Sequence, residues 1–276
     1  MDLGLSGRVA IVSGGSRGIG RAIATRLVAE GADVVLAARR EGDLAEAAAA
    51  IRASAPGGGR VATACADMSD VAAVQGVVDV AHDLGPVGIV VSNVIGHVID
   101  AAKEGTGPAA GTFSTIDSAD YREEFTRLLV SAWALAEAAL PDMRQQHWGR
   151  VVNIGSGVAR EPTKDLPHVL PNTVRPAVAG LYRVLARRLA DDGITVNSIL
   201  TGSILTERNR SYWEWLAKER GLPVEQVRSV MTDSIPARRM GEPDELAAVV
   251  AFLVSERGRS VTGQSIPVDG GINRHL

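Results

Sequence analysis

The sequence predicts a single α/β domain over residues 1–276, with one doubly wound parallel sheet of about seven strands and helices on both faces. Two observations predict this fold. Short apolar runs rich in β-branched residues alternate with longer segments of helical period along the whole chain. Most of the short runs are apolar at successive positions, which is typical of parallel strands covered on both sides. No linker, internal repeat or low-complexity tract divides the chain.

The individual elements follow from these patterns. Ile19, Ile23 and Leu27 are spaced by four and predict a helix after the first strand. Segment Asp117–Gln146 has the longest apolar stripe, and Pro243 opens a late helix because proline suits a first helical turn. The predicted strands are Val9–Ser13, Asp33–Ala38, Val61–Cys65, Val87–Ser92, Val151–Ile154, Ile194–Leu200 and Ser265–Val268.

Two long segments break the alternation of strands and helices. Asn93–Ile116 follows the fourth predicted strand, and Thr201–Pro236 follows the sixth. Both begin at the carboxyl end of a strand, where open α/β sheets bind their ligands. Connections this long in compact domains are often functional, so we expect the binding site at this edge.

Composition and charge exclude several classes of protein. The chain has 29 Lys and Arg against 32 Asp and Glu, a net charge of −3, which argues against nucleic-acid binding and against a polybasic membrane anchor. The longest weakly polar stretch, Leu128–Leu140, is too short to span a bilayer. The single cysteine, Cys65, excludes an intrachain disulfide framework, and no signal-peptide pattern is found at the start. We therefore expect a cytoplasmic protein, with no metal site.

A glycine-rich segment, residues 13–20, follows the first predicted strand and leads into a helix. Its glycines let the backbone turn sharply and approach a pyrophosphate, to which the helix N-terminus presents amide groups. A tight strand-to-helix turn without a ligand is the alternative. The position directly after the first strand favours a dinucleotide site, whose expected binding residues are Gly14, Ser16, Arg17, Gly18, Ile19 and Gly20.

The end of the second predicted strand favours NADP(H) over NAD(H). An acidic residue there would bind the ribose hydroxyls of NAD, but this chain has Ala38 followed by Arg39 and Arg40. Guanidinium groups suit a 2′-phosphate, and Arg17 in the glycine loop adds a third. The alternative is that these arginines are solvated surface charges.

These features resemble the short-chain dehydrogenase/reductase family over nearly the whole chain. The glycine spacing is that family's Gly-x-x-x-Gly-x-Gly, and residues 92–96 stand where the family has Asn-Asn-Ala-Gly. Residues 151–156 resemble the strand that ends in the family's serine, and residues 235–245 and 262–271 resemble its C-terminal signatures. The resemblance implies a Rossmann-type fold and a substrate lid at about 203–236. It also implies further cofactor contacts from Asp67, Met68, Asn93, Ile204 and Thr206.

The family's catalytic pattern is broken in this chain. The family uses Asn, Ser and a Tyr-x-x-x-Lys pair, and no Tyr-x-x-x-Lys is present. Pro171 falls on the tyrosine position and Arg175 on the lysine position, and the asparagine position falls on or near Leu128, so only Ser156 is kept. Proline cannot transfer a proton, and arginine is effectively always protonated. The unmodified family mechanism is therefore excluded, although Arg175 can still hold ribose hydroxyls and Ser156 a substrate oxygen.

Replacement acids must come from elsewhere in the chain. His97 lies just beyond the fourth predicted strand and suits acid–base chemistry near neutral pH, so we expect it to act with Ser156 and Arg175. His168 lies in the segment that shapes the same opening, and we expect it to contact substrate. For each histidine, a plain surface role is the alternative. Tyr182 lies two helical turns beyond Arg175 and is expected to pack or to face solvent.

The long segment after the sixth strand contains Tyr212, Trp213 and Trp215. Aromatic side chains in a lid suggest an apolar small-molecule substrate contacted by Trp213. Helix packing or a subunit contact is the alternative. The resemblance also implies a homotetramer or homodimer. In agreement with this, Asp117–Gln146 and Asn172–Ala190 have more apolar positions than are needed to cover one sheet face, and a two-fold interface would bury the surplus.

Three functions fit these observations. The first is an NADP(H)-dependent oxidoreductase acting on a carbonyl or alcohol through a rebuilt proton relay. The second is a non-redox enzyme on the same fold, such as a cyclase, isomerase or dehydratase, which the loss of three catalytic positions favours. The third is a non-catalytic NADP(H)-binding protein. Fold alone does not decide among them.

Overall fold

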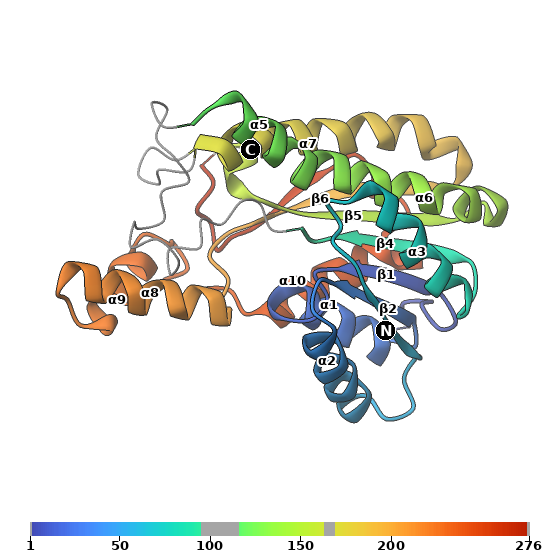
Figure 1. The fold of residues 1–276 in the computed structure, drawn as a ribbon, viewed down its shortest axis with the longest axis horizontal. Helices are drawn as coiled ribbons and strands as arrows, with labels where there is room; N and C mark the ends of the chain where they lie inside the picture. The colour runs from blue at the N-terminus through green and yellow to red at the C-terminus, as the bar shows by residue number, and fades with distance from the viewer. Residues whose placement is uncertain (1, 95–115, 163–168, 275–276) are drawn as a thin grey trace.

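The computed structural model describes residues 2–94, 116–162 and 169–274. Within these ranges, seven parallel strands form one sheet in the order β3-β2-β1-β4-β5-β6-β7 (Figure 1). The predicted α/β fold is confirmed. The strand order reverses between β1 and β4, and such a switch point is where doubly wound sheets bind ligands. The strands are β1 (Val9–Ser13), β2 (Asp33–Ala38), β3 (Val61–Cys65), β4 (Val87–Ser92), β5 (Gly149–Ser156), β6 (Ile194–Thr201) and β7 (Ser265–Val268).

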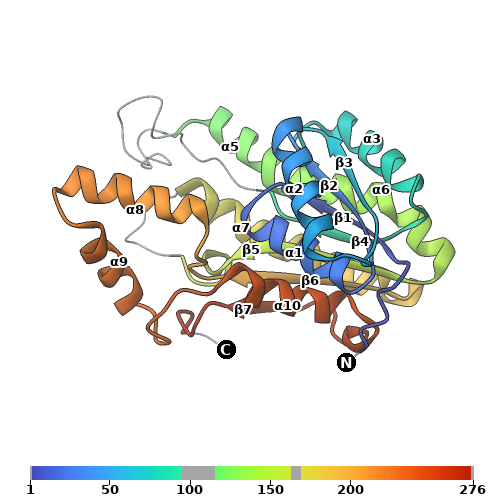
Figure 2. The same ribbon diagram turned by 90° about the horizontal axis from the view of Figure 1, so that it is seen from below.

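Helices cover both faces of the sheet (Figure 2). Alternate strand residues point to opposite faces, so Ala10 and Val12 join one apolar core while Val9 and Ile11 join the other. The first core is covered by α1 (Gly18–Ala29), α2 (Glu41–Ser54) and α10 (Pro243–Val254). The second core is covered by α3 (Val71–His82), α6 (Ser131–Gln146) and α7 (Val169–Leu189).

The expected long helix over 117–146 is interrupted. It consists of α5 (Ser118–Phe125), a π-helical turn at Thr126–Val130 and then α6. Asp117 caps α5 by accepting hydrogen bonds from the backbone amides of Ala119 and Asp120. Single π-helical turns inside helices are frequent at functional sites, and this one contains Leu128.

The segment expected at about 203–236 forms a helical pair beside the sheet edge (Figure 1). We call α8 (Glu207–Arg220) and α9 (Val224–Asp233) the α8–α9 unit. The unit has a small apolar cluster of its own, formed by Trp213, Ala217, Val227, Ile235 and Met240.

A charged cluster surrounds one tryptophan at the amino end of the sheet. The guanidinium groups of Arg8 and Arg150 lie 3.8 and 4.4 Å from the ring centroid of Trp148. The indole N–H donates to the carboxylate of Glu256 at 2.6 Å. β5 starts at Gly149, earlier than predicted, although Arg150 is charged. Arg150 is only 2% exposed, because its guanidinium group lies over the ring, donates to backbone carbonyls and lies 3.8 Å from Glu256.

No helix in the described parts of the chain is long and apolar enough to cross a membrane.

Candidate functional site

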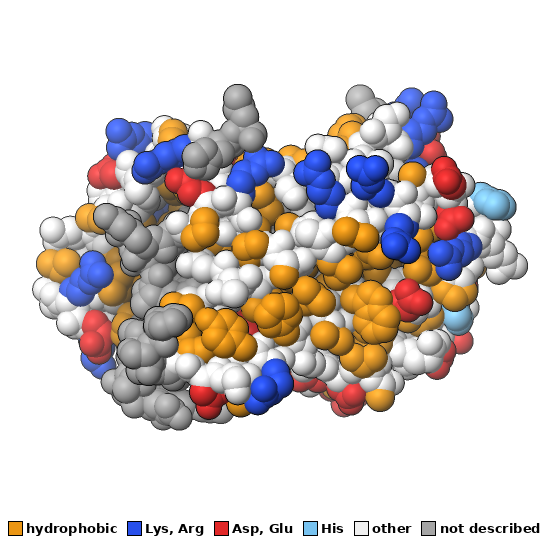
Figure 3. Space-filling view, turned by 90° about the horizontal axis from the view of Figure 1, so that it is seen from above, with side chains coloured by type: hydrophobic (Ala, Val, Ile, Leu, Met, Phe, Trp, Pro, Cys, Tyr) orange, Lys and Arg blue, Asp and Glu red, His pale blue; other side chains and the backbone are white. Residues whose placement is uncertain are grey.

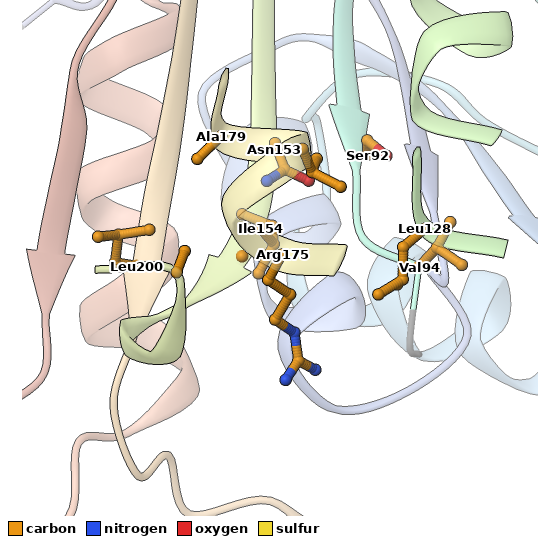
Figure 4. A pocket seen from close by; sticks show the side chains of 11 residues that line it. Ser92, Val94, Leu128, Asn153, Ile154, Arg175, Ala179 and Leu200 are labelled. Atoms are coloured by element: carbon orange, nitrogen blue, oxygen red, sulfur yellow. The ribbon is translucent and has the colours of Figure 1, made fainter. Parts of the chain in front are cut away.

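A pocket lies at the carboxyl edge of β4, β5 and β6, where the sequence placed the binding site (Figure 4). We call it the edge pocket. Strand ends, the π-helical turn and α7 all contribute to its walls. Among the described residues that line it, only Arg175 is charged, and its side chain extends away from α7 (Figure 4). The walls include Ser92, Leu128, Asn153, Ile154, Arg175 and Leu200.

The glycine loop between β1 and α1 requires its glycines for steric reasons. Gly14 and Gly18 have φ angles of 62° and 55°, in the left-handed region that favours glycine. A Cβ on Gly20 would lie 2.1 Å from the carbonyl oxygen of Gly14 and 2.6 Å from the side-chain nitrogen Nδ2 of Asn93. Asn93 itself supports the loop, because its backbone N–H donates to the Ser13 hydroxyl at 2.8 Å and its side-chain amide to Gly14 at 3.4 Å.

The N-terminus of α1 fits a phosphate group. Arg17 occupies the capping position in an extended conformation and makes no side-chain capping bond. No acidic residue lies in the first turn of α1. The amide groups of this turn are therefore left for a ligand, and the helix dipole favours an anion. With the close backbone approach at Gly20, the loop is a cradle that fits a dinucleotide pyrophosphate.

The two arginines after β2 differ in their contacts. Arg39 reaches toward Asp67, with 4.0 Å between its Nη1 and the carboxylate, and two-thirds of its side chain is exposed. Arg40 forms a 2.6 Å ion pair with Asp43 in the first turn of α2. Partial burial raises the pKa of the Asp67 carboxyl, but hydrogen bonds from Ser69 and the Arg39 charge outweigh it and lower the pKa overall. Because Arg39 has only this long contact whereas Arg40 is held in a close ion pair, Arg39 is the better candidate for binding a 2′-phosphate.

Several expected cofactor contacts also take part in packing or capping, and their contact with a cofactor stays a prediction. The side chain of Met68 is buried in the second core. Ile204 is also buried and pairs with Gly241. Thr206 caps α8 by accepting from the amide of Asn209, and its methyl group faces the glycine loop, 3.6 Å from where a Cβ on Gly18 would lie. Thr206 therefore connects the α8–α9 unit with the glycine loop.

Two of the family's four catalytic positions line the edge pocket. Leu128 and Arg175 both line it. Pro171 is buried in the first turn of α7, where a proline is tolerated because its missing N–H would have no helical partner. Ser156 ends β5 in register with Thr201 and is half-buried, outside the lining of the pocket. His97 and His168 lie outside the described residues.

Charge at the edge pocket is dominated by arginine. Burial lowers the pKa of Arg175, the nearby charge of Arg208 lowers it further, and Glu124 opposes both. Desolvation likewise lowers the pKa of Arg208, and the charge of Arg17 adds to this effect. The charge of Arg17 thus acts on Arg208, and the charge of Arg208 acts on Arg175, between the glycine loop and the pocket. The Glu124 carboxylate opposes the positive charge at Arg175. No group of three or more potential metal-ligating side chains is found among the described residues.

Two residues near the site differ from what the sequence led us to expect. Glu124 was not predicted, yet its carboxylate is fully buried on α5, one helical turn before Leu128. The sequence signal that could have identified Glu124 is an acidic residue four positions before Leu128, on the side of the helix that carries the apolar residues. Trp213 is only 4% exposed and packs inside the α8–α9 unit, which favours the packing role over substrate contact.

Comparison with known proteins agrees with this geometry. A family model described as enoyl-(acyl carrier protein) reductase matches residues 14–273. A D-beta-hydroxybutyrate dehydrogenase from Cupriavidus necator is 35% identical over 272 residues, which cover 97% of this chain and 98% of that protein. The chain belongs to the short-chain dehydrogenase/reductase family. Membership in this family explains both the glycine loop and the seven-stranded sheet.

Solved members of the short-chain dehydrogenase/reductase family have the same overall structure. L-Sorbose reductase from Gluconobacter frateurii, crystallised with NADPH and L-sorbose, superposes with a TM-score of 0.90 at 30% identity over the full length of both chains. A short-chain oxidoreductase from Pseudomonas aeruginosa PAO1, with NADPH bound, superposes with a TM-score of 0.85 at 29% identity over 99% of each chain. That enzyme is described as having an atypical catalytic centre, so departures from the family's catalytic pattern occur on this fold.

Proposed function

We propose that this protein is an NADP(H)-dependent oxidoreductase that interconverts a carbonyl and an alcohol on an apolar small molecule. The observation that carries the proposal is the complete cradle for a dinucleotide, formed by the glycine loop and the uncapped N-terminus of α1. Relatives named as dehydrogenases and reductases, some solved with NADPH, support it. A cytoplasmic location is part of the proposal and rests on the exposed free thiol of Cys65.

The preference for NADP(H) rests on charge. Arg17 lies at the start of α1, and Arg39 follows β2 with its outer face free. A 2′-phosphate between them would gain charge-assisted hydrogen bonds, whereas no carboxylate ends β2 to bind ribose hydroxyls. Calorimetry with NADPH and NADH tests this, and equal affinities would contradict it.

When bound, the cofactor supplies or accepts a hydride at its nicotinamide ring. The residues of this chain would hold the reactants and manage the proton. Ser156 would donate a hydrogen bond to the substrate oxygen. Arg175 would hold ribose hydroxyls and place a positive charge near an oxygen that becomes negative. Arg175 retains its proton at any working pH, so another group must deliver the proton. His97 stays our prediction for a side chain in that role.

The walls of the edge pocket support an apolar substrate. Apart from Ser92, Asn153 and Arg175, the named lining is apolar, and Leu128 replaces the polar family residue. Substrate contact by His168 stays a prediction. The π-helical turn holds Leu128 in the lining, so Leu128→Asn is expected to make the pocket more polar without altering the glycine loop.

An oligomer is also part of the proposal. Apolar side chains gather over the face formed by α5, α6 and α7 (Figure 3). Trp133, Phe125 and Val184 are 41%, 37% and 52% exposed there. A two-fold related copy of the same chain would cover this face self-complementarily, giving a homodimer or, with a second interface, a homotetramer.

One experiment separates the candidate functions. Purified protein is mixed with NADPH and a broad panel of carbonyl compounds, and NADPH absorbance is followed. Oxidation that depends on the carbonyl supports the oxidoreductase. Pro171 stands where the family has an acidic tyrosine hydroxyl, and this loss favours the non-redox alternative. A non-redox enzyme is expected to keep its full native turnover after the cofactor is removed. Tight NADPH binding without turnover in either assay would indicate a cofactor-binding protein.

A further inference from the structure

A row of polar side chains crosses the sheet just before its carboxyl edge. Ser92 on β4, Asn153 on β5 and Ser198 on β6 are register partners on neighbouring strands, and Ser13 on β1 stands beside Ser92. We call these four residues the polar row. All are buried, with exposed fractions from 0 to 8%. The same face carries Val90, Val151 and Val196 one step earlier, so the polar row ends an otherwise apolar core.

A buried tyrosine covers the polar row. Tyr182 on α7 is 1% exposed, and its hydroxyl lies beside Ser92. The Tyr182 hydroxyl has Ser92 as a side-chain partner, and the Ser198 hydroxyl has no hydrogen-bond partner within the described ranges of the chain. Leaving a buried hydroxyl unpaired costs about 1–3 kcal/mol, so the unpaired Ser198 hydroxyl indicates a missing polar partner beside the polar row.

The edge pocket provides space for that partner. Ser92 and Asn153 belong both to the polar row and to the pocket lining, and Arg175 lies across from them (Figure 4). The pocket has room for water, and a water molecule is held where two to four polar groups converge. We propose that ordered water, held by Ser92 and Asn153 and backed by Tyr182, occupies the edge pocket and carries the proton that the missing tyrosine cannot deliver.

The proposal rests on the proposed reduction of a carbonyl. Hydride addition to the carbonyl carbon breaks the C–O π bond and leaves a negative oxygen. A water proton then moves to this oxygen, completing the O–H bond of the alcohol. The hydroxide that remains is reprotonated from bulk solvent through the open side of the pocket, so one hydride and one proton are consumed in total. The charge of Arg175 stabilises both negative oxygens.

Tyr182 serves as a positioning residue in this scheme. Burial raises the pKa of its hydroxyl, with the contact to Ser92 opposing in part, so the group stays protonated. It can orient Ser92 and the water but is too weak an acid to supply the proton.

A crystal structure of the protein at high resolution tests the water directly. We expect density for water within hydrogen-bond distance of the Ser92 hydroxyl and the Asn153 amide. The water should be lost or displaced in Ser92→Ala. A pocket that is dry in the parent protein overturns the proposal.

Kinetics test the role of the water. With a carbonyl that the parent reduces, Tyr182→Phe and Ser92→Ala should lower kcat at least ~10-fold, below the usual ~100-fold effect of a direct acid because water remains available. KM and NADPH affinity should not change, and the solvent deuterium isotope effect should rise. Tyr121→Phe removes the same hydroxyl from a half-buried tyrosine on α5 and serves as the matched control.

Unchanged kcat and isotope effect in both variants would exclude the proton-carrying role even if the water is present. A parent protein that oxidises no NADPH with any carbonyl overturns the proposed function and that role together. The presence of ordered water in the edge pocket would then be tested by crystallography alone.

Discussion

Replacing Gly20 with alanine separates steric fit from helix propensity. Gly20 is a buried residue of the first turn of α1, where alanine is intrinsically better than glycine by about 0.5–1 kcal/mol. The new Cβ, however, would lie 2.1 Å from the carbonyl oxygen of Gly14. Because this oxygen belongs to the backbone, it cannot move aside as the end of a flexible side chain could. Overpacking of this kind costs ~3 kcal/mol at the upper end of the usual range. We therefore expect a net loss of ~2 kcal/mol in the free energy of unfolding.

The same change should weaken cofactor binding. Moving α1 away from Gly14 displaces the amide groups that face the pyrophosphate, and we expect at least a tenfold loss of NADPH affinity, ~1.4 kcal/mol. Urea unfolding and calorimetry measure the two effects.

Gly76→Ala is the control for this substitution. Gly76 lies in the exposed middle of α3, and a Cβ added there would meet no atom within 4 Å among the described residues. This substitution should stabilise the protein by about 0.5–1 kcal/mol and leave NADPH affinity unchanged. Equal or higher stability of Gly20→Ala, with NADPH affinity preserved, would refute the steric argument for the glycine loop.

Four further predictions follow from the structure. Arg39→Ala should weaken NADPH binding by ~1.5–3 kcal/mol and leave NADH binding unchanged in calorimetry, because only the 2′-phosphate contact is lost. Pro171→Tyr combined with Arg175→Lys should raise NADPH oxidation with simple ketones, and no increase would indicate that the start of α7 is misplaced for the family mechanism. The pKa of Glu245 is lowered to about 2, first by the hydrogen bonds from the Arg239 guanidinium. The ionised Glu245 carboxylate therefore stabilises the fold fully above its unfolded pKa of about 4.3, and this stabilisation is lost as the pH falls toward 2. The difference in urea midpoint between the parent and Glu245→Gln should be constant from pH 5 to 8 and should shrink below pH 4. Trp133→Glu should reduce the light-scattering mass toward the 28.9 kDa of one chain, and a parent already at that mass would contradict the oligomer.

The strands were predictable because burial on both faces leaves a direct mark on the sequence. The bounds of β1, β2, β3, β4 and β7 agree with the prediction, since apolar runs there end at polar or glycine-rich segments. β5 extends two residues beyond the prediction at each end. The N-terminal extension includes Arg150, whose charge hides a strand position that its contacts with Trp148, Glu256 and backbone carbonyls make acceptable.

Features of the site that depend on neighbouring elements were less visible. The apolar positions keep spacings of three and four across the π-helical turn, so the interruption at 126–130 left no clear signal. The burial of Glu124 and Tyr182 depends on the packing of α5 and α7 against each other and of α7 against β5 and β6. The glycine loop was predictable because its geometry excludes every other residue type at Gly14 and Gly20.

The environment of Trp148 has a spectroscopic consequence. The chain has four tryptophans, and they lie in three separate parts of the molecule. Trp148 sits among charged groups at the amino end of the sheet, whereas Trp213 and Trp215 are in the α8–α9 unit and Trp133 is on the exposed face of α6. Nearby guanidinium groups and a carboxylate hydrogen bond alter indole emission, so Trp148 would report loss of the sheet independently of events at the α8–α9 unit. Single-tryptophan variants would thus distinguish global unfolding from ligand-induced movement in one fluorescence titration.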